Sequence, residues 1–131
     1  MIYTGYYGGL QKVSGSVVKV QVSNSAPVPT DIVFEKAIPD WAFIVKPYKD
    51  GNITKEEYTE RYLLQLDKYS ENITGVARYF NESGKDYILL CYEKPGDFCH
   101  RHILADYINR ILGEGNVREY GQTNLQSNAL F

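Results

Sequence analysis

The sequence predicts an α/β fold in which a mostly parallel sheet is flanked by helices, giving three layers in a single domain. Segments typical of strands alternate with segments typical of helices along the chain, which is the pattern of such layered folds. The continuous apolar run over residues 87–92 suits a central strand that is covered on both faces. With 131 residues, the chain is long enough to bury a core without disulfides or metal ions.

Two strands are expected near the N-terminus. Residues 2–7 are rich in β-branched and aromatic side chains and stop at a pair of glycines, which predicts a strand that ends in a turn. Residues 17–22 alternate in part between apolar and polar side chains, which predicts a second strand. The following segment, 23–31, is a polar loop with prolines, and residues 32–48 show only a short apolar run and no clear pattern.

Helix-capping signals place two helices in the middle of the chain. Thr54 and Glu57 form a capping box, and the apolar residues that follow recur at helical spacing. Ser70 can cap a second helix, which also carries apolar residues on one face. Gly84 is expected to end that helix, because glycine readily adopts the left-handed conformation beyond a helix C-terminus.

The last third of the chain repeats the strand-to-helix pattern. After the central strand, Asp97 is the expected N-cap of a third helix of about 15 residues, which ends at Gly113. Residues 117–120 favour a final strand. We therefore expect the domain to span residues 1–120 and residues 121–131 to form a polar tail.

Charge and composition argue against several classes of protein, although they do not exclude a local basic patch or a nucleic-acid partner. The formal net charge is -2, whereas a general nucleic-acid or membrane-surface binder needs a basic excess. The apolar runs are much shorter than the roughly 20 residues that span a bilayer, and the N-terminus lacks the features of a signal peptide. We therefore expect a cytoplasmic protein, and in that compartment its two cysteines are expected to be free thiols.

Chemically reactive side chains are concentrated between the end of the apolar strand and the start of the third helix. Ligands of open α/β sheets bind outside the carboxyl ends of the strands, and a helix N-terminus attracts anions. The first turn carries His100, Arg101 and His102, whose positive charge is unfavourable beside the positive end of the helix dipole. An external anion would remove this conflict. Alternatively, Arg101 pairs with Glu93 across the turn, and the histidines are solvated.

The two cysteines differ in their expected environments. Cys99 lies near the second position of the helix, where the dipole and the adjacent basic groups favour its thiolate, so it is the candidate nucleophile. Cys91 ends the buried strand and fits equally well as a small core residue. Zinc ligation by Cys91, Cys99 and a histidine is conceivable, but the paired spacing of structural zinc sites is absent. We therefore expect neither a metal nor a cofactor.

This segment resembles the signature of the uncharacterised family catalogued as domain of unknown function 488, which occurs in bacteria and phages. Members show a strand ending in Leu-Cys-x-Glu, a short loop, and then Cys-His-Arg opening a helix. The matching residues here are Cys91, Glu93, Cys99, His100 and Arg101. The opening segment, residues 2–6, is also similar, whereas residues 11–45 follow no pattern that we can match. The resemblance implies the fold class and the importance of the motif, but it implies no reaction.

Three functions remain open on the sequence alone. The first is an enzyme or a binding protein for a small anionic or nucleotide-like molecule. In that case Cys99, Glu93 and His100 are the expected catalytic residues, as nucleophile or as general acid and base. The guanidinium of Arg101 would bind the anion, and the ring of Tyr6 would stack on a base or sugar. Neighbouring side chains would add further contacts. These expected ligand-binding residues are Arg101, Tyr6, Thr4 and Cys91.

The second function is thiol redox or sulfur chemistry, in which Cys99 attacks and Cys91 resolves. It requires the two sulfur atoms to lie within bridging distance, and if the Cα atoms lie well beyond about 7 Å apart, Cys91 cannot resolve without backbone movement. The third is a non-catalytic interaction protein in which the motif only stabilises the turn: Arg101 and Glu93 fix its shape, and His100 caps a neighbouring loop. Burial and mutual satisfaction of Cys99, His100 and Arg101 would favour this function. The sequence does not decide whether the protein is an enzyme.

Overall fold

Five parallel strands form one sheet in the computed structural model, which describes residues 1–94 and 96–121. The strand order is β3-β2-β4-β1-β5, and all of the neighbouring pairs are parallel. The strands are β1 (Ile2–Tyr6), β2 (Val18–Gln21), β3 (Ile32–Val33), β4 (Tyr87–Cys91) and β5 (Val117–Glu119). The all-parallel sheet confirms the predicted α/β class.

The central strand is β4, as its apolar sequence predicts. All five of its residues are buried, and it pairs with β1 on one side and with β2 on the other. The register aligns Tyr6, the last residue of β1, with Cys91, the last residue of β4. The carboxyl ends of these strands therefore lie at one edge of the sheet.

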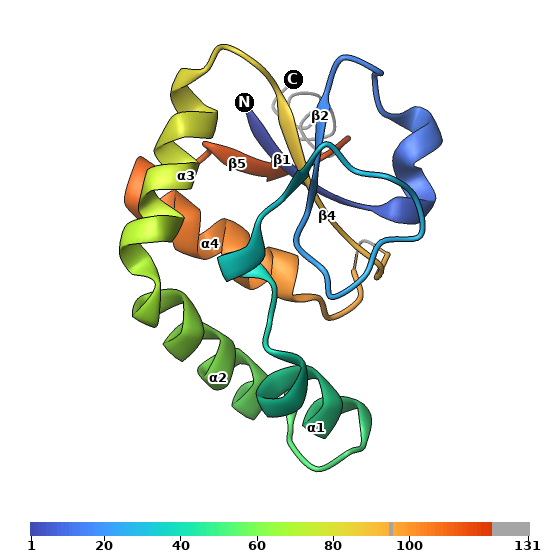
Figure 1. Cartoon of the computed structure of the whole chain (residues 1–131), viewed down its shortest axis with the longest axis vertical. Helices are drawn as coiled ribbons and strands as arrows, with labels where there is room; N and C mark the ends of the chain where they lie inside the picture. The colour runs from blue at the N-terminus through green and yellow to red at the C-terminus, as the bar shows by residue number, and fades with distance from the viewer. Residues whose placement is uncertain (95, 122–131) are drawn as a thin grey trace, which may run out of the picture.

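The two faces of the sheet are covered unequally. The helix α4 (His100–Leu112) packs on one face, with α2 (Lys55–Lys68) and α3 (Ser70–Glu82) on the same side (Figure 1). This side holds the larger core, which includes Leu66, Leu89 and Leu104. The opposite face has a smaller core around Ile88 and Leu90, covered in part by the short 3-10 helix η1 (Tyr7–Lys12).

The segment that gave no clear pattern forms short helical turns. It contains the 3-10 helix η2 (Glu35–Ala37), the π-helical turn η3 (Trp41–Val45) and the short helix α1 (Lys46–Lys49). The side chain of Gln65 in α2 donates to the carbonyls of Lys36 and Ile38, and so attaches this segment to the helix layer.

Some of the predicted boundaries are confirmed, and others differ by one or more residues. The second strand is shorter than predicted, and the N-cap of α3 is Tyr69 and not Ser70. The capping box of Thr54 and Glu57 is present. The first strand ends one residue early, because Tyr7 begins η1 instead of extending the strand. The third helix has 13 residues, and its N-cap is Cys99 and not Asp97. Cys99 is joined by a disulfide to Cys91 at the end of β4, and the helix begins directly after this attachment. The predicted tail lies outside the described residues from position 122 onward.

Across residues 1–94 and 96–121, no helix combines the length and the apolar character that a membrane crossing requires.

Candidate functional site

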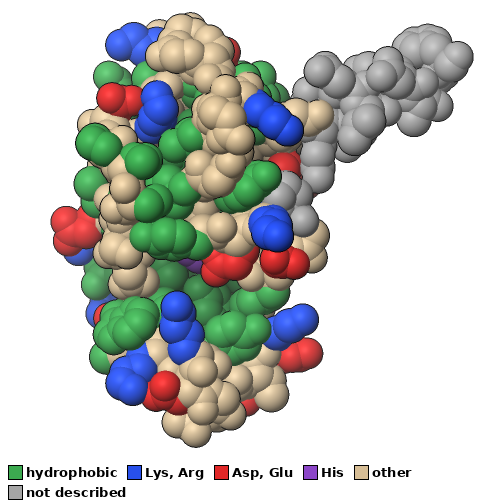
Figure 2. Space-filling model, turned by 90° about the vertical axis from the view of Figure 1, so that its right-hand side faces the viewer, with side chains coloured by type: hydrophobic (Ala, Val, Ile, Leu, Met, Phe, Trp, Pro, Cys, Tyr) green, Lys and Arg blue, Asp and Glu red, His purple; other side chains and the backbone are tan. Residues whose placement is uncertain are grey.

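A cavity of about 160 Å³ opens at the carboxyl edge of the sheet. Its walls include Ser23, Asn24 and Ser25, which follow β2, and Cys91, Tyr92 and Glu93, at the end of β4. The N-terminus of α4 and the η3–α1 segment complete it. Figure 2 shows a hollow crossing this face, bordered by hydrophobic and acidic side chains, with a histidine visible inside.

The cavity has aromatic walls. The rings of Tyr48, Tyr58 and Phe98 contact one another, with centroid distances of 5.1 to 5.5 Å. Trp41 and Tyr92 add two rings that are about half exposed. Burial raises the pKa of Tyr58, and the carboxylate of Glu93 adds to the rise, so this phenol stays protonated at neutral pH. The walls therefore present flat apolar surfaces of the kind that hold an aromatic or heterocyclic ring.

The floor of the cavity is formed by Cys91, Cys99 and His100. The sulfur atoms of the two cysteines are joined in a disulfide, and their Cα atoms are 7.5 Å apart. The expectation of two free thiols is therefore wrong. The loop after β4 folds back across the end of that strand, which brings together two cysteines that are eight positions apart in the sequence.

His100 is buried and electrically neutral. Its Nε2 atom bonds to the carbonyl oxygen of Val22, and because a carbonyl oxygen only accepts, Nε2 carries the proton. Its Nδ1 atom then has a free lone pair, 3.9 Å from the sulfur of Cys99. Burial lowers the pKa of His100 to about 4, and the charge of Arg101 contributes to the lowering, against the hydrogen bond to Val22.

Arg101 lies beneath the cavity and not in its wall. It is 0% exposed, and its Nε and Nη2 atoms donate to the carboxylate of Glu119 at 3.1 and 2.8 Å. Its Nη1 atom donates to the sulfur of Cys91 at 3.0 Å and to the backbone carbonyl of Glu93 at 2.6 Å. The hydroxyl of Thr4 donates to the same carboxylate at 2.6 Å.

This arrangement corrects the expected role of Arg101. The positive first turn of α4 does require an anion, but the chain supplies it as the carboxylate of Glu119 on β5. The alternative of a bridge to the side chain of Glu93 is also corrected, because Arg101 contacts only the backbone carbonyl of that residue. The guanidinium is therefore not available to a bound ligand.

The other expected site residues separate into two groups. Glu93 lines the cavity with Cys91, Cys99 and His100. Thr4 is buried in the network around Glu119, and the ring of Tyr6 lies against the backbone of η1, so neither lines the cavity. The residue after Tyr6 comes closer, because the hydroxyl of Tyr7 is 2.8 Å from that of Ser23 in the cavity wall.

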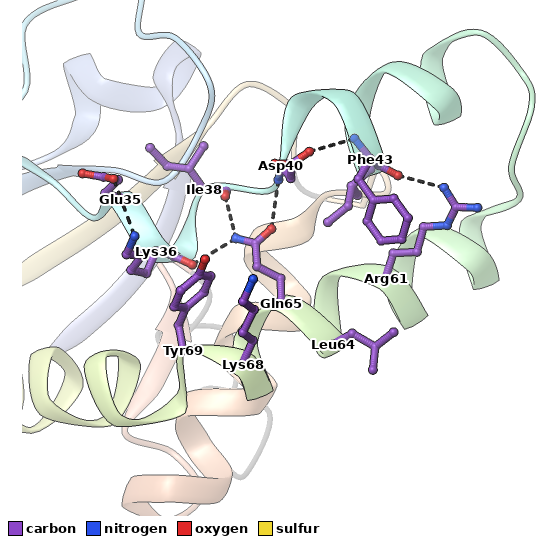
Figure 3. Close-up of a pocket in the computed structure, with 11 residues that line it drawn as sticks. Glu35, Lys36, Ile38, Asp40, Phe43, Arg61, Leu64, Gln65, Lys68 and Tyr69 are labelled. Carbon is purple, nitrogen blue, oxygen red and sulfur yellow. Dashed lines mark hydrogen bonds and ion pairs between the residues drawn. The ribbon is translucent and has the colours of Figure 1, made fainter.

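A second, wider cavity lies between α2 and the η2–η3 segment (Figure 3). Gln65 projects into it, donating to two backbone carbonyls and accepting from the backbone N–H of Asp40. Arg61 donates to the carbonyl of Phe43. These polar groups hold the segment in place, and no cysteine or histidine lines this cavity. It is therefore a structural junction, and the smaller cavity is the candidate site.

Comparison with known proteins supports the resemblance seen in the motif. The chain matches the family model described as the active DUF488-N3 subclade over residues 15–112, which is about three quarters of its length. The matched range includes both cysteines, His100 and Arg101. No curated protein and no solved structure matches the chain.

Replacing Glu119 by Gln should reduce the free energy of unfolding by roughly 3–5 kcal/mol, because it leaves the buried charge of Arg101 without its partner. Urea denaturation of the purified variant measures the loss. Glu114→Gln is the matched control, since Glu114 is exposed in the turn before β5 and should change stability by less than about 0.5 kcal/mol. If the two substitutions reduced the free energy of unfolding equally, the buried ion pair of Arg101 and Glu119 would not have the stabilising role assigned to it.

The depressed pKa of His100 predicts a stability loss in mild acid. The unfolded state, with a histidine pKa near 6.5, binds more protons than the folded state between about pH 6.5 and pH 4. Stability is therefore complete above pH 6.5 and falls by about 2 kcal/mol between pH 7 and pH 5. Urea denaturation at both pH values should show a smaller loss of unfolding free energy in His100→Gln than in the unmodified protein. The control His102→Gln should retain most of it, and a fall as large in His100→Gln as in the unmodified protein would disprove the assignment.

Proposed function

The chain belongs to the active DUF488-N3 subclade, and we propose that it acts as a thiol–disulfide protein whose redox centre is Cys91 and Cys99. The observation that carries this proposal is the disulfide on the floor of a cavity that both cysteines line. Disulfides of cytoplasmic proteins are usually transient and serve catalysis or redox sensing. In the compartment that the sequence favours, a bridge at the base of a ligand-sized cavity therefore fits a reactive pair better than a structural one.

The surroundings of the two sulfurs suggest different roles for them. Cys99 is the N-cap of α4, where the positive end of the helix dipole favours its thiolate, and the Nδ1 atom of neutral His100 lies 3.9 Å from its sulfur. These features support Cys99 as the attacking thiolate. Cys91 accepts a hydrogen bond from the guanidinium of Arg101, which favours its thiolate and so supports it as the resolving residue. Arg101 acts here as a positioning residue.

The proposed cycle has two exchange steps. In the reduced protein, the thiolate of Cys99 attacks one sulfur of a substrate disulfide, forms a mixed disulfide, and releases the other sulfur as a thiolate. The thiolate of Cys91 then attacks the sulfur of Cys99, releases the second substrate thiolate, and forms the disulfide between Cys91 and Cys99. An external dithiol restores both thiols and leaves as a disulfide.

The cavity favours a substrate that carries a ring. Its volume of about 160 Å³ is close to that of an apolar cavity that holds benzene, and it is smaller than a typical site for a drug-sized ligand. It therefore fits one ring of a larger molecule. Lys49 and Glu93 bring opposite charges to its lining, and the charge of Arg101 is neutralised by Glu119. These features support recognition of a ring on the substrate, and they do not support recognition of an anionic group.

A specific observation also favours the non-catalytic alternative. Cys99, His100 and Arg101 are 2%, 6% and 0% exposed, and each has a partner within the chain. Burial and internal partners of this kind are what a motif that only stabilises the turn would show. The two functions differ in one respect: only the thiol–disulfide function requires Cys99 and then Cys91 to react with a small molecule that enters the cavity.

A small aromatic disulfide, 5,5′-dithiobis(2-nitrobenzoate), tests the proposal. The reduced protein should release two equivalents of the coloured thiolate and end as the internal disulfide without an adduct, as judged by intact mass. Cys91→Ser should release one equivalent and retain the mixed disulfide on Cys99, because it lacks the resolving thiol. Cys99→Ser should be slow to react.

The matched control is His102→Gln, which changes a neighbouring half-buried histidine outside the cavity and should react like the unmodified protein. A folded, reduced protein that does not react, or that carries a separate adduct on each cysteine, would favour the non-catalytic alternative.

A further inference from the structure

We infer that the reduced protein binds one zinc ion through Cys91, Cys99 and His100, with a fourth coordination position open to the cavity. Within the described residues, these three side chains form a buried cluster whose potential ligand atoms all lie within 4.8 Å of one another. Two thiolates and an imidazole are ligands that zinc prefers. The inference rests on the proposed function in one respect, because the disulfide must be reducible before the sulfurs can bind a metal.

The geometry needs little rearrangement once the disulfide is reduced. Tetrahedral zinc, with bonds of about 2.3 Å to sulfur and about 2.0 Å to nitrogen, places two sulfur ligands about 3.8 Å apart and a sulfur and a nitrogen about 3.5 Å apart. The Nδ1 atom of His100 is already 3.9 Å from the sulfur of Cys99. The Cα atoms of the two cysteines, 7.5 Å apart, leave room for their sulfurs to separate around an ion.

The surroundings of the cluster match those of bound metals. Histidine ligands generally donate their other ring N–H to a carbonyl or carboxylate, and the Nε2 of His100 bonds to the carbonyl of Val22 in this way. This contact aims the lone pair of Nδ1 at the sulfurs. The guanidinium of Arg101 donates to Cys91, and because Glu119 neutralises it, no net positive charge opposes a cation beneath the cavity.

The site would leave zinc incompletely coordinated by the protein. Structural zinc ions usually have four protein ligands, whereas catalytic ones have three and bind water or substrate at the fourth position. Here the three ligands form the floor of the cavity, so the open position faces the space between the aromatic walls. The class of ligand expected there is water, or a donor atom on the ring-bearing substrate.

Metal binding and oxidation would exclude each other. Zinc binding to the reduced pair displaces the two thiol protons. Reaction of the zinc-bound dithiolate with glutathione disulfide and two protons yields the disulfide of Cys91 and Cys99, two glutathione thiols and free Zn²⁺. The site would therefore release its ion on oxidation and take it up on reduction.

Cobalt(II) is a spectroscopic probe for this site, because thiolate ligation gives charge-transfer bands in the near ultraviolet. Titration of the reduced full chain should show one equivalent bound, with bands that disappear when Zn²⁺ is added. The disulfide form of the same protein should show no thiolate band. His100→Gln should weaken binding by about tenfold or more, since even residues that only support a metal ligand contribute 10–100-fold. His102→Gln, outside the cluster, should bind as the unmodified protein does.

Several outcomes would overturn the inference. These are a reduced, folded protein without a thiolate-to-cobalt band, an equal response from the disulfide form, and equal weakening by the two histidine substitutions. If His100→Gln does not fold, the comparison of the reduced and oxidised unmodified protein decides the question. Counting the thiols by alkylation in each sample separates the two proposals. A pair that oxidises and reduces but binds no cobalt refutes the zinc site alone, and a pair that binds cobalt but never forms the disulfide refutes the thiol cycle alone.

Discussion

A buried ion pair between Arg101 and Glu119 holds together the part of the molecule that carries the candidate site. Through four donated hydrogen bonds, Arg101 connects the first turn of α4 to β5, to the end of β4 and to the loop that follows it. The hydroxyl of Thr4 joins β1 to the same carboxylate. Because a buried charge without its partner is costly, these contacts fix the loop after β4 and therefore the position of Cys99 over Cys91. The pair also removes net charge from below the cavity, so the chemistry of the site depends on sulfur and imidazole and not on an exposed cation.

The sequence predicts the frame of the fold and the location of the site. The apolar run of β4 indicates a strand buried on both faces, and the capping box at Thr54 marks the start of α2. The order of a buried strand, a loop with turn residues and a helix places Cys91 and Cys99 at the carboxyl edge of the sheet, where the cavity lies. These features are local, because each depends on side chains within one segment, and local patterns can be recognised without knowing which strands become neighbours.

The contacts that define the site join distant segments, and they could not be predicted in the same way. Glu119 is the partner of Arg101 because β5 pairs with β1, and nothing in the sequence around Glu119 indicates that pairing. The aromatic walls come partly from Trp41 and Tyr48, in the stretch without a clear pattern, and from Tyr58, a buried position of α2 that its helical spacing marks only as core. The sequence has 12 tyrosines, but this number fits a tyrosine-rich core edge as well as a cavity with aromatic walls, so it does not locate the cavity. The helix begins after Cys99, where the disulfide joins it to the end of β4. A capping rule based on neighbouring residues takes no account of this distant contact and therefore favours Asp97.

The most direct test of the central claim is the equilibrium between the dithiol and the disulfide in the unmodified full-length chain. The protein is equilibrated with buffers of varied glutathione redox potential and quenched in acid, and the alkylated thiols are then counted by mass. We expect a single transition between no alkylated cysteine and two, reversible in both directions and with the fold retained in each state. Two alkylated cysteines at every potential, or glutathione adducts in place of the internal disulfide, would contradict the account.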